Sequence, residues 1–187
     1  DKHVTWIHNV HNMDFLMCVD DQACLEALSL VQEGGALLTE MGVPSGEAEP
    51  LLGTFGVSGM CNVLGAIKTA KTLNLGADDV VVTVATDGFD RYPSVLANLA
   101  EQTTPLSRDL AFQRLGHFHH AATGWVLEGS RAVRERWHNQ KYFTWVEQQG
   151  RTVDELRALA DPATWVAEQA KIETIDAALK QERCALA

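Results

Sequence analysis

The chain has 187 residues, of which 21% are charged and 46% hydrophobic, and its formal net charge is −10. This length allows one ordinary domain with a real core, and the composition is typical of globular proteins. Nucleic acids and anionic membrane surfaces attract clustered Lys and Arg, so the acidic balance argues against both as the main partner. No apolar run approaches the roughly 18 residues that span a bilayer.

The first third of the sequence carries a strand pattern followed by a helix pattern. Residues 14–19 (DFLMCV) form a short apolar run that predicts a buried strand. A helix is expected directly after it, with Asp20 or Asp21 as the N-cap and Gly34 at its end. Glycine, proline and serine follow in residues 36–50, which we interpret as an insertion or lid.

The next stretch repeats this alternation around a glycine-rich turn. A brief strand is predicted at 51–55 and a helix from about 59 to 74. Residues 79–88 (DVVVTVATDG) give the strongest strand pattern. Their apolar run is continuous, as expected for a strand covered on both faces in a parallel sheet. Alternating strands and helices predict an α/β fold with right-handed crossovers.

Beyond about residue 96 the pattern is helical and contains no convincing strand. Thr152 and Glu155 mark a helix start, and Pro162 suits the first turn of another helix. We therefore divide the chain into an α/β region, residues 1–95, and a helical carboxyl-terminal extension, residues 96–187.

The glycine turn has two interpretations from its residues alone. Glycines allow a chain to enter a helix tightly, and Ser58 can cap that helix, so the turn can be purely structural. Alternatively, the backbone N–H groups of the helix start can face a bound anion. The glycine spacing matches neither the Walker pattern nor GxGxxG, so the turn itself is weak support for a ligand.

Three stretches together resemble the carboxyl-terminal half of fold type II pyridoxal-phosphate enzymes, the cysteine synthase and cystathionine β-synthase-like family. They read DFLMCVDDQACLEALSLV, GVSGMCNVLGAIKTAK and VVVTVATDGFDRYPS. The resemblance covers about half of the chain. The helical tail has no counterpart in the small cysteine synthases and points to a longer branch of the family.

The third stretch is the most specific part of this resemblance. Asp87, Arg91, Tyr92 and Ser94 keep the family's relative places, and Asp90 stands where the family has Glu. The turn departs from the family pattern, because Gly59 stands where the family has a second serine.

The resemblance implies a binding site for pyridoxal 5'-phosphate. Ser58 would hydrogen-bond to the pyridine nitrogen of the cofactor, Gly56 and Gly59 would shape the turn, and Asp87 would lie near the ring. A neutral hydroxyl leaves that nitrogen mostly unprotonated, which weakens the ring as an electron sink. The implied reaction is β-elimination or β-replacement on a small amino acid.

The family's Schiff-base lysine lies in its amino-terminal half and has no counterpart here. Lys68 and Lys71 match the solvent face of the helix after the turn, so we reject them for this role. The chain begins with Asp1 in a pattern typical of the middle of a domain. We therefore expect a missing amino-terminal half or a second chain to supply the lysine, within a homo-oligomer.

A second hypothesis assigns no catalysis to this chain. It would then be a structural or regulatory subunit that completes the fold of a partner and binds no cofactor alone.

The cysteines and histidines predict no metal centre. None of the four cysteines forms a CxxC pair, so we expect buried free thiols, as in a reducing compartment such as the cytoplasm. His117, His119 and His120 cluster, as do His8 and His11. Without carboxylate or cysteine ligands at fitting spacing, we interpret them as solvent or interface residues.

Overall fold

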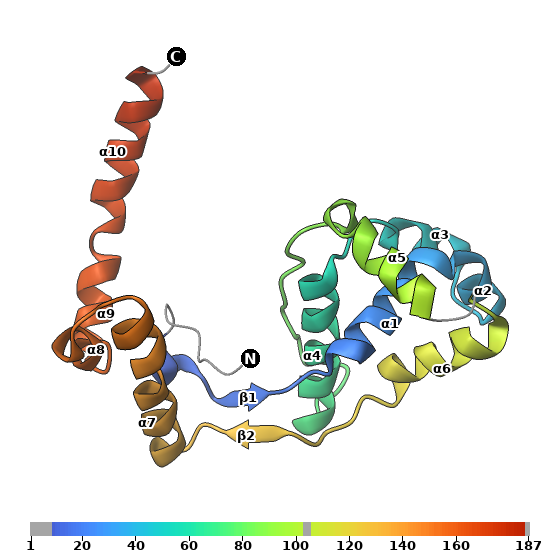
Figure 1. Cartoon of the computed structure of the whole chain (residues 1–187), viewed down its shortest axis with the longest axis horizontal. Coiled ribbons are helices and arrows are strands. Elements are labelled where there is room, and N and C mark those ends of the chain that lie inside the picture. The colour runs from blue at the N-terminus through green and yellow to red at the C-terminus, as the bar shows by residue number, and fades with distance from the viewer. Residues whose placement is uncertain (1–8, 103–105, 186–187) are drawn as a thin grey trace. The chain divides into compact units, whose positions relative to one another are not determined.

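The structure is a computed structural model that describes residues 9–102 and 106–185, and it divides into two compact units. A central unit comprises Met17–Val126, and a terminal unit comprises the residues on either side of it. The chain passes between the units along two short strands, β1 (Phe15–Met17) and β2 (Val126–Glu128), which pair with each other (Figure 1). The predicted boundary at residues 95 and 96 lies inside a helix of the central unit.

The central unit is helical in its described residues. Its α-helices are α1 (Asp21–Glu33), α2 (Gly35–Glu40), α3 (Ser45–Ala48), α4 (Val57–Thr72), α5 (Pro93–Gln102) and α6 (Arg108–His119). Two short 3-10 helices, Glu49–Leu51 and Phe89–Arg91, lie between them. The predicted N-cap of α1 is confirmed, because Asp20 Oδ1 accepts the Ala23 N–H at 2.8 Å and Gly34 follows the last turn.

Helix α1 forms the centre of this unit. One cluster of buried residues joins it to α4 and comprises Cys24, Ala27, Leu28, Val31, Met60 and Leu64. A second cluster joins Leu30 of α1 to Leu38 of α2 and Ala111 of α6. Leu28, Leu30 and Ala27 are each 0% exposed, so α1 is buried on more than one side. Burying one leucine side chain contributes about 1.5–3 kcal/mol, so the buried leucines of α1 make a large contribution to the stability of this unit.

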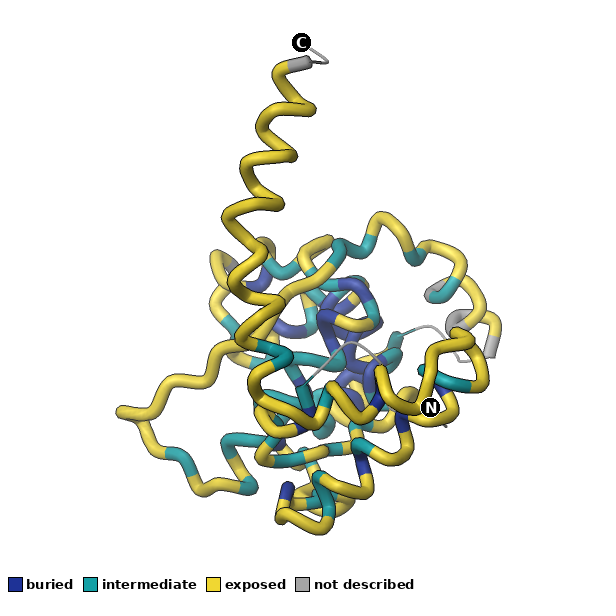
Figure 2. Tube along the Cα trace, turned by 90° about the vertical axis from the view of Figure 1, so that its left-hand side faces the viewer, coloured by how far each residue is buried: buried dark blue, intermediate teal, exposed yellow. Residues whose placement is uncertain are grey.

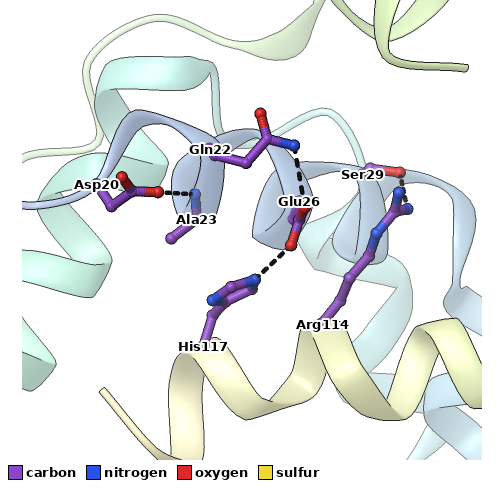
Figure 3. A network of polar contacts seen from close by, with 7 residues as sticks. All are labelled: Asp20, Gln22, Ala23, Glu26, Ser29, Arg114 and His117. Atoms are coloured by element: carbon purple, nitrogen blue, oxygen red, sulfur yellow. Dashed lines mark hydrogen bonds and ion pairs between the residues drawn. The ribbon is translucent and has the colours of Figure 1, made fainter. Parts of the chain in front are cut away.

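Polar contacts between α1 and α6 add to this packing (Figure 3). Glu26 accepts a hydrogen bond from Gln22 at 2.9 Å and lies 2.7 Å from His117 Nε2. The Arg114 guanidinium, which is 2% exposed, donates to Ser29 Oγ at 2.7 Å. Because buried polar groups are costly without partners, these contacts allow charged side chains to lie against the apolar core.

The predicted α/β fold with a parallel sheet is wrong. The described residues are mostly helical, and their sheet consists of two antiparallel strands. The valine-rich run at 80–84, predicted as the strongest strand, belongs to no strand, and Val80 and Val82 are 84% and 86% exposed. β-Branched residues favour an extended backbone, but a strand also needs a neighbour with which to exchange hydrogen bonds. The described part of the chain offers this run no such neighbour.

Two further strand predictions are changed by local geometry. The strand predicted at 51–55 is wrong, because a 3-10 helix and a turn with Gly53 at φ +75° occupy this stretch. The strand predicted at 14–19 is confirmed in part as β1, but β1 is not buried, since Leu16 is 41% exposed. Its partner β2 lies within the tail that was predicted to be helical throughout.

The terminal unit contains α7 (Arg131–Gln140), a π-helical segment (Phe143–Gln148), α8 (Val153–Ala158), α9 (Pro162–Gln169) and α10 (Ile172–Ala185). The predicted helix start at Thr152 is confirmed as a capping box with Glu155, and Pro162 opens α9 as expected. Helix α10 is exposed along its described length (Figure 2). In the described residues, no helix has the length and apolar character to cross a membrane.

The exposed valine run leads to a stability prediction. Replacing Val82 by lysine should change the free energy of unfolding by less than about 0.5 kcal/mol, because surface substitutions remove little packing. Replacing the buried Leu64 by alanine should cost about 2–5 kcal/mol in the same urea titration. A large loss in Val82→Lys would show that the run is packed.

The contact between Glu26 and His117 should make stability depend on pH. Burial raises the pKa of Glu26, but the hydrogen bonds from Gln22 and His117 outweigh it and place this pKa below the ordinary value of 4.5. A carboxyl with a depressed pKa stabilises the fold above its unfolded pKa, and this contribution disappears as the pH falls through the folded pKa.

Glu26→Gln should therefore lower the free energy of unfolding at pH 7 by up to about 1 kcal/mol. The difference from the unsubstituted chain should shrink as the pH is lowered from 5 to 3, as measured by urea unfolding at each pH. Glu40→Gln changes an exposed carboxyl of the same unit and serves as the control. A difference that stays constant with pH would contradict the prediction.

Candidate functional site

The residues predicted to contact a cofactor ring gather at the first turn of α4. Gly56 is the N-cap of this helix, and no side chain caps its amide groups. Ser58 lies within the first turn and its side chain is exposed. The interpretation of Ser58 as the cap is wrong, because the helix begins one residue before it and its hydroxyl points to a different partner.

A second segment, residues 86–92, lies against this helix start. After α4 the chain turns back along the helix, so the two stretches lie side by side (Figure 1). The Gly56 N–H donates to the Asp87 carbonyl at 2.8 Å, and the Phe89 N–H donates to the Gly53 carbonyl at 3.0 Å. These backbone hydrogen bonds hold the segment in place without a sheet.

Gly56 is required by this close approach. A Cβ atom at Gly56 would lie 2.5 Å from the Tyr92 ring and 2.9 Å from the Asp87 carbonyl oxygen. Gly59 is less constrained, since its nearest contact would be 3.4 Å from Phe55. The prediction that glycines shape the turn is therefore supported most strongly at Gly56.

A series of polar side chains connects the half-buried Tyr92 to the exposed Ser58. The Tyr92 hydroxyl donates to Asp87 Oδ2 at 2.7 Å. The Thr86 hydroxyl lies 3.1 Å from Asp87 Oδ1 and 3.2 Å from Ser58 Oγ. The structure thus brings Ser58 and Asp87 together, with Thr86 between them.

The charge of this series resides on Asp87. The hydrogen bond from Tyr92, aided by Thr86 and by the positive charge of Arg91, lowers the pKa of the Asp87 carboxyl. The same hydrogen bond to Asp87 raises the pKa of the Tyr92 phenol. At neutral pH the pair is therefore an ionised carboxylate and a neutral phenol.

The ionised carboxylate determines how the protons are arranged. Asp87 can only accept hydrogen bonds, so Tyr92 and Thr86 can both donate to it. When Thr86 uses its single proton for Asp87, the Ser58 hydroxyl is left to donate to Thr86 or to another acceptor beside the helix. Ser58 is the neutral, exposed end of this series, and it can give a hydrogen bond to a ligand atom.

The two lysines of α4 are engaged elsewhere. The Lys68 ammonium is buried and donates to the Cys18 carbonyl at 2.7 Å, so its predicted place on the solvent face is wrong. Lys71 is exposed and donates to the His119 carbonyl at 2.5 Å. Both contacts use the nitrogen that a Schiff base would need.

In the described residues, the side-chain hydrogen bonds of this site involve no histidine or cysteine. His117 pairs with Glu26, and His119 and His120 lie at the end of α6. Within residues 9–102 and 106–185, no group of three or more metal-ligating side chains is close enough to hold an ion. Cys24 is buried, and burial together with the neighbouring Cys61 raises its pKa to about 12. The expectation of buried thiols is wrong for Cys18 and Cys184, which are exposed.

Sequence reasoning missed Thr86 and assigned no role to Tyr92. Both side chains contact Asp87, and Tyr92 also packs closely on Gly56. Thr86 directly precedes Asp87 in the sequence, and this position could have indicated that it belongs to the site. The contact of Tyr92 with the helix start depends on the chain turning back, which no local pattern indicates.

Comparisons of this chain with models of protein families, with curated proteins and with solved structures find no match. The chemistry that the site can support therefore follows from its own side chains. These are an exposed neutral hydroxyl, a bridging threonine and an ionised carboxylate shielded by tyrosine.

The close approach at Gly56 predicts a large effect of a single methyl group. Gly56→Ala should destabilise the central unit by about 1–3 kcal/mol, because the Tyr92 ring and the Asp87 backbone must move. Gly35→Ala is the matched control, since nothing lies within 4 Å of a Cβ there and alanine favours the helix. Urea unfolding of both variants tests this, and equal stability would contradict the packing at Gly56.

Proposed function

We propose that this chain supplies the ring-contacting part of a pyridoxal 5'-phosphate-dependent enzyme that performs β-elimination or β-replacement on a small amino acid. The observation that carries the proposal is the exposed Ser58 hydroxyl at the start of α4, beside residues 86–92. These are the two stretches on which the family resemblance depends most, and they are in contact although they are distant in the sequence.

The donor set at this position fits a pyridine nitrogen. An unprotonated pyridine nitrogen accepts one hydrogen bond, and Ser58 has one proton to give. Asp87 is less suited to the ring contact, because Tyr92 and Thr86 already occupy both of its carboxylate oxygens. The ring would therefore meet a neutral hydroxyl rather than a charge.

The choice of Ser58 as the hydrogen-bond partner of the ring nitrogen determines which reactions the cofactor favours. A bound pyridoxal phosphate supplies an electron sink for cleavage of bonds at the α-carbon of the substrate. Ser58 leaves the ring nitrogen unprotonated, and its oxygen can accept the Thr86 proton while its own proton is given to the ring. Asp87 stays ionised through its contact with Tyr92 and keeps Thr86 in place.

The enzyme needs groups that the central unit does not offer. Lys68 and Lys71 donate to backbone carbonyls, so we expect the Schiff-base lysine to come from a missing amino-terminal half or a second chain. We also propose that the enzyme is a homo-oligomer. A reducing compartment such as the cytoplasm is in keeping with its free thiols.

One observation favours the alternative of a non-catalytic subunit. The run at 80–84 belongs to no strand and exposes its valines, and its one printed backbone contact is the hydrogen bond from Asn62 Nδ2 to the Val84 carbonyl at 2.9 Å. Such a run can be completed by a strand of another chain. On this hypothesis the chain contributes structure to a partner and binds no cofactor ring alone.

Nuclear magnetic resonance with pyridoxine 5'-phosphate distinguishes the two functions. This compound has the ring but no aldehyde, so it forms no imine with surface lysines. We expect saturable shifts of the amides of Ser58, Gly59 and Thr86. Ser58→Ala should weaken this binding about fivefold, since one neutral hydrogen bond contributes roughly 1 kcal/mol.

Thr39→Ala removes an exposed hydroxyl from α2 of the same unit and should leave the affinity unchanged. Inorganic phosphate in a parallel titration separates ring binding from phosphate binding. If the amides at the start of α4 do not respond, or if Ser58→Ala binds as tightly as the unsubstituted chain, the ring contact is wrong and the non-catalytic function is favoured.

A further inference from the structure

A cavity of about 340 Å³ lies within the terminal unit and shares no lining residue with the proposed ring contact. It is lined by His11, Arg131, Arg134, Glu135, His138 and Ala160. Four of these side chains come from α7, at positions that repeat along one face of the helix. The cavity is large enough for a small organic molecule.

Arg131 is the cation that is available to a ligand. It is exposed in the first turn of α7, and its guanidinium has no hydrogen-bond or ion-pair partner among the described residues. Arg134 differs, because it donates to the Met13 carbonyl at 2.9 Å and to Asp14 at 2.8 Å. The helix start adds a partial positive charge at the Arg131 end of the cavity.

His138 contributes an unsatisfied polar atom at the other end. Its Nδ1 is buried and has no hydrogen-bond partner in the described part of the chain. Buried polar atoms in folded proteins nearly always have a partner, so this atom indicates a group or water that completes the site. Burial, the positive charge of Lys141 and the nearby His11 all lower the pKa of His138.

The charges of the lining favour an anion over a cation. The lining holds two arginines and two histidines against one carboxylate, Glu135, and since Asp14 pairs with Arg134, Arg131 is the arginine whose charge is left for a ligand. The metal alternative is weak, since the described residues hold no group of three metal-ligating side chains. An arginine fork binds planar or tetrahedral oxyanions in two-point contacts.

We propose that this cavity binds a small molecule bearing a phosphate or carboxylate group, held by Arg131 and hydrogen-bonded by His138. Arg134, held by its partner Asp14, forms the part of the cavity wall between Arg131 and His138. This site is independent of the ring contact at α4 and uses different residues. For a probe whose own charge stays constant, binding strengthens as the pH falls, because protonation of His138, whose pKa lies below its ordinary value of 6.5, adds positive charge to the cavity.

The test uses the full chain with two probes, inorganic phosphate and succinate, each compared with sodium chloride at equal ionic strength. Imidazole resonances of His11 and His138 are followed by nuclear magnetic resonance. We expect saturable shifts at His138 with at least one probe and a rise in its measured pKa when the probe is bound. A response to phosphate alone, to succinate alone or to both probes identifies the anionic group that the cavity prefers.

Arg131→Ala should weaken binding by roughly tenfold or more, as expected for the loss of a charge-assisted contact. Arg136→Ala is the matched control, because it removes the same charge from the same helix at an exposed position that does not line the cavity. His138→Gln should abolish most of the pH dependence. The proposal is overturned if neither probe shifts His138 saturably, or if Arg131→Ala and Arg136→Ala weaken binding equally.

Discussion

The burial of α1 against both α4 and α6 is the interaction on which the central unit depends. Leu28 packs toward α4 and Leu30 toward α2 and α6, so one helix supplies apolar contacts in more than one direction. This arrangement replaces the sheet that the strand patterns predicted. Helix α4, which packs on α1, carries the candidate site at its first turn.

Close backbone contact, and not a pocket of large side chains, gives the site its geometry. With no side chain at Gly56, residues 87 and 92 can approach the helix start, and Gly53 adopts a backbone angle that favours glycine. The returning segment then places a carboxylate and a hydroxyl beside Ser58. The polar groups are close together because the backbones are close together.

The hydrogen bonds of the site separate a charged group from a neutral one. Tyr92 and Thr86 surround the Asp87 carboxylate, whereas the Ser58 hydroxyl remains exposed. The terminal unit differs in character, since its cavity gathers arginine and histidine around a single carboxylate. In a chain with a strongly acidic balance, we thus propose one site for a neutral acceptor and one for an anion.

The sequence by itself determined those elements whose signals lie within a few neighbouring residues. Asp20 begins α1, Thr152 and Glu155 form a capping box, and α4 extends close to its predicted range, because caps and helical periodicity act within a few residues. The grouping of Ser58 and Asp87 in one site was also expected from the sequence. The tertiary structure decided whether an apolar run becomes a strand, because pairing needs a partner that the run itself does not encode. It also decided that Tyr92 and Thr86 complete the site and that Lys68 is buried, because those contacts join residues that only the folded chain brings together.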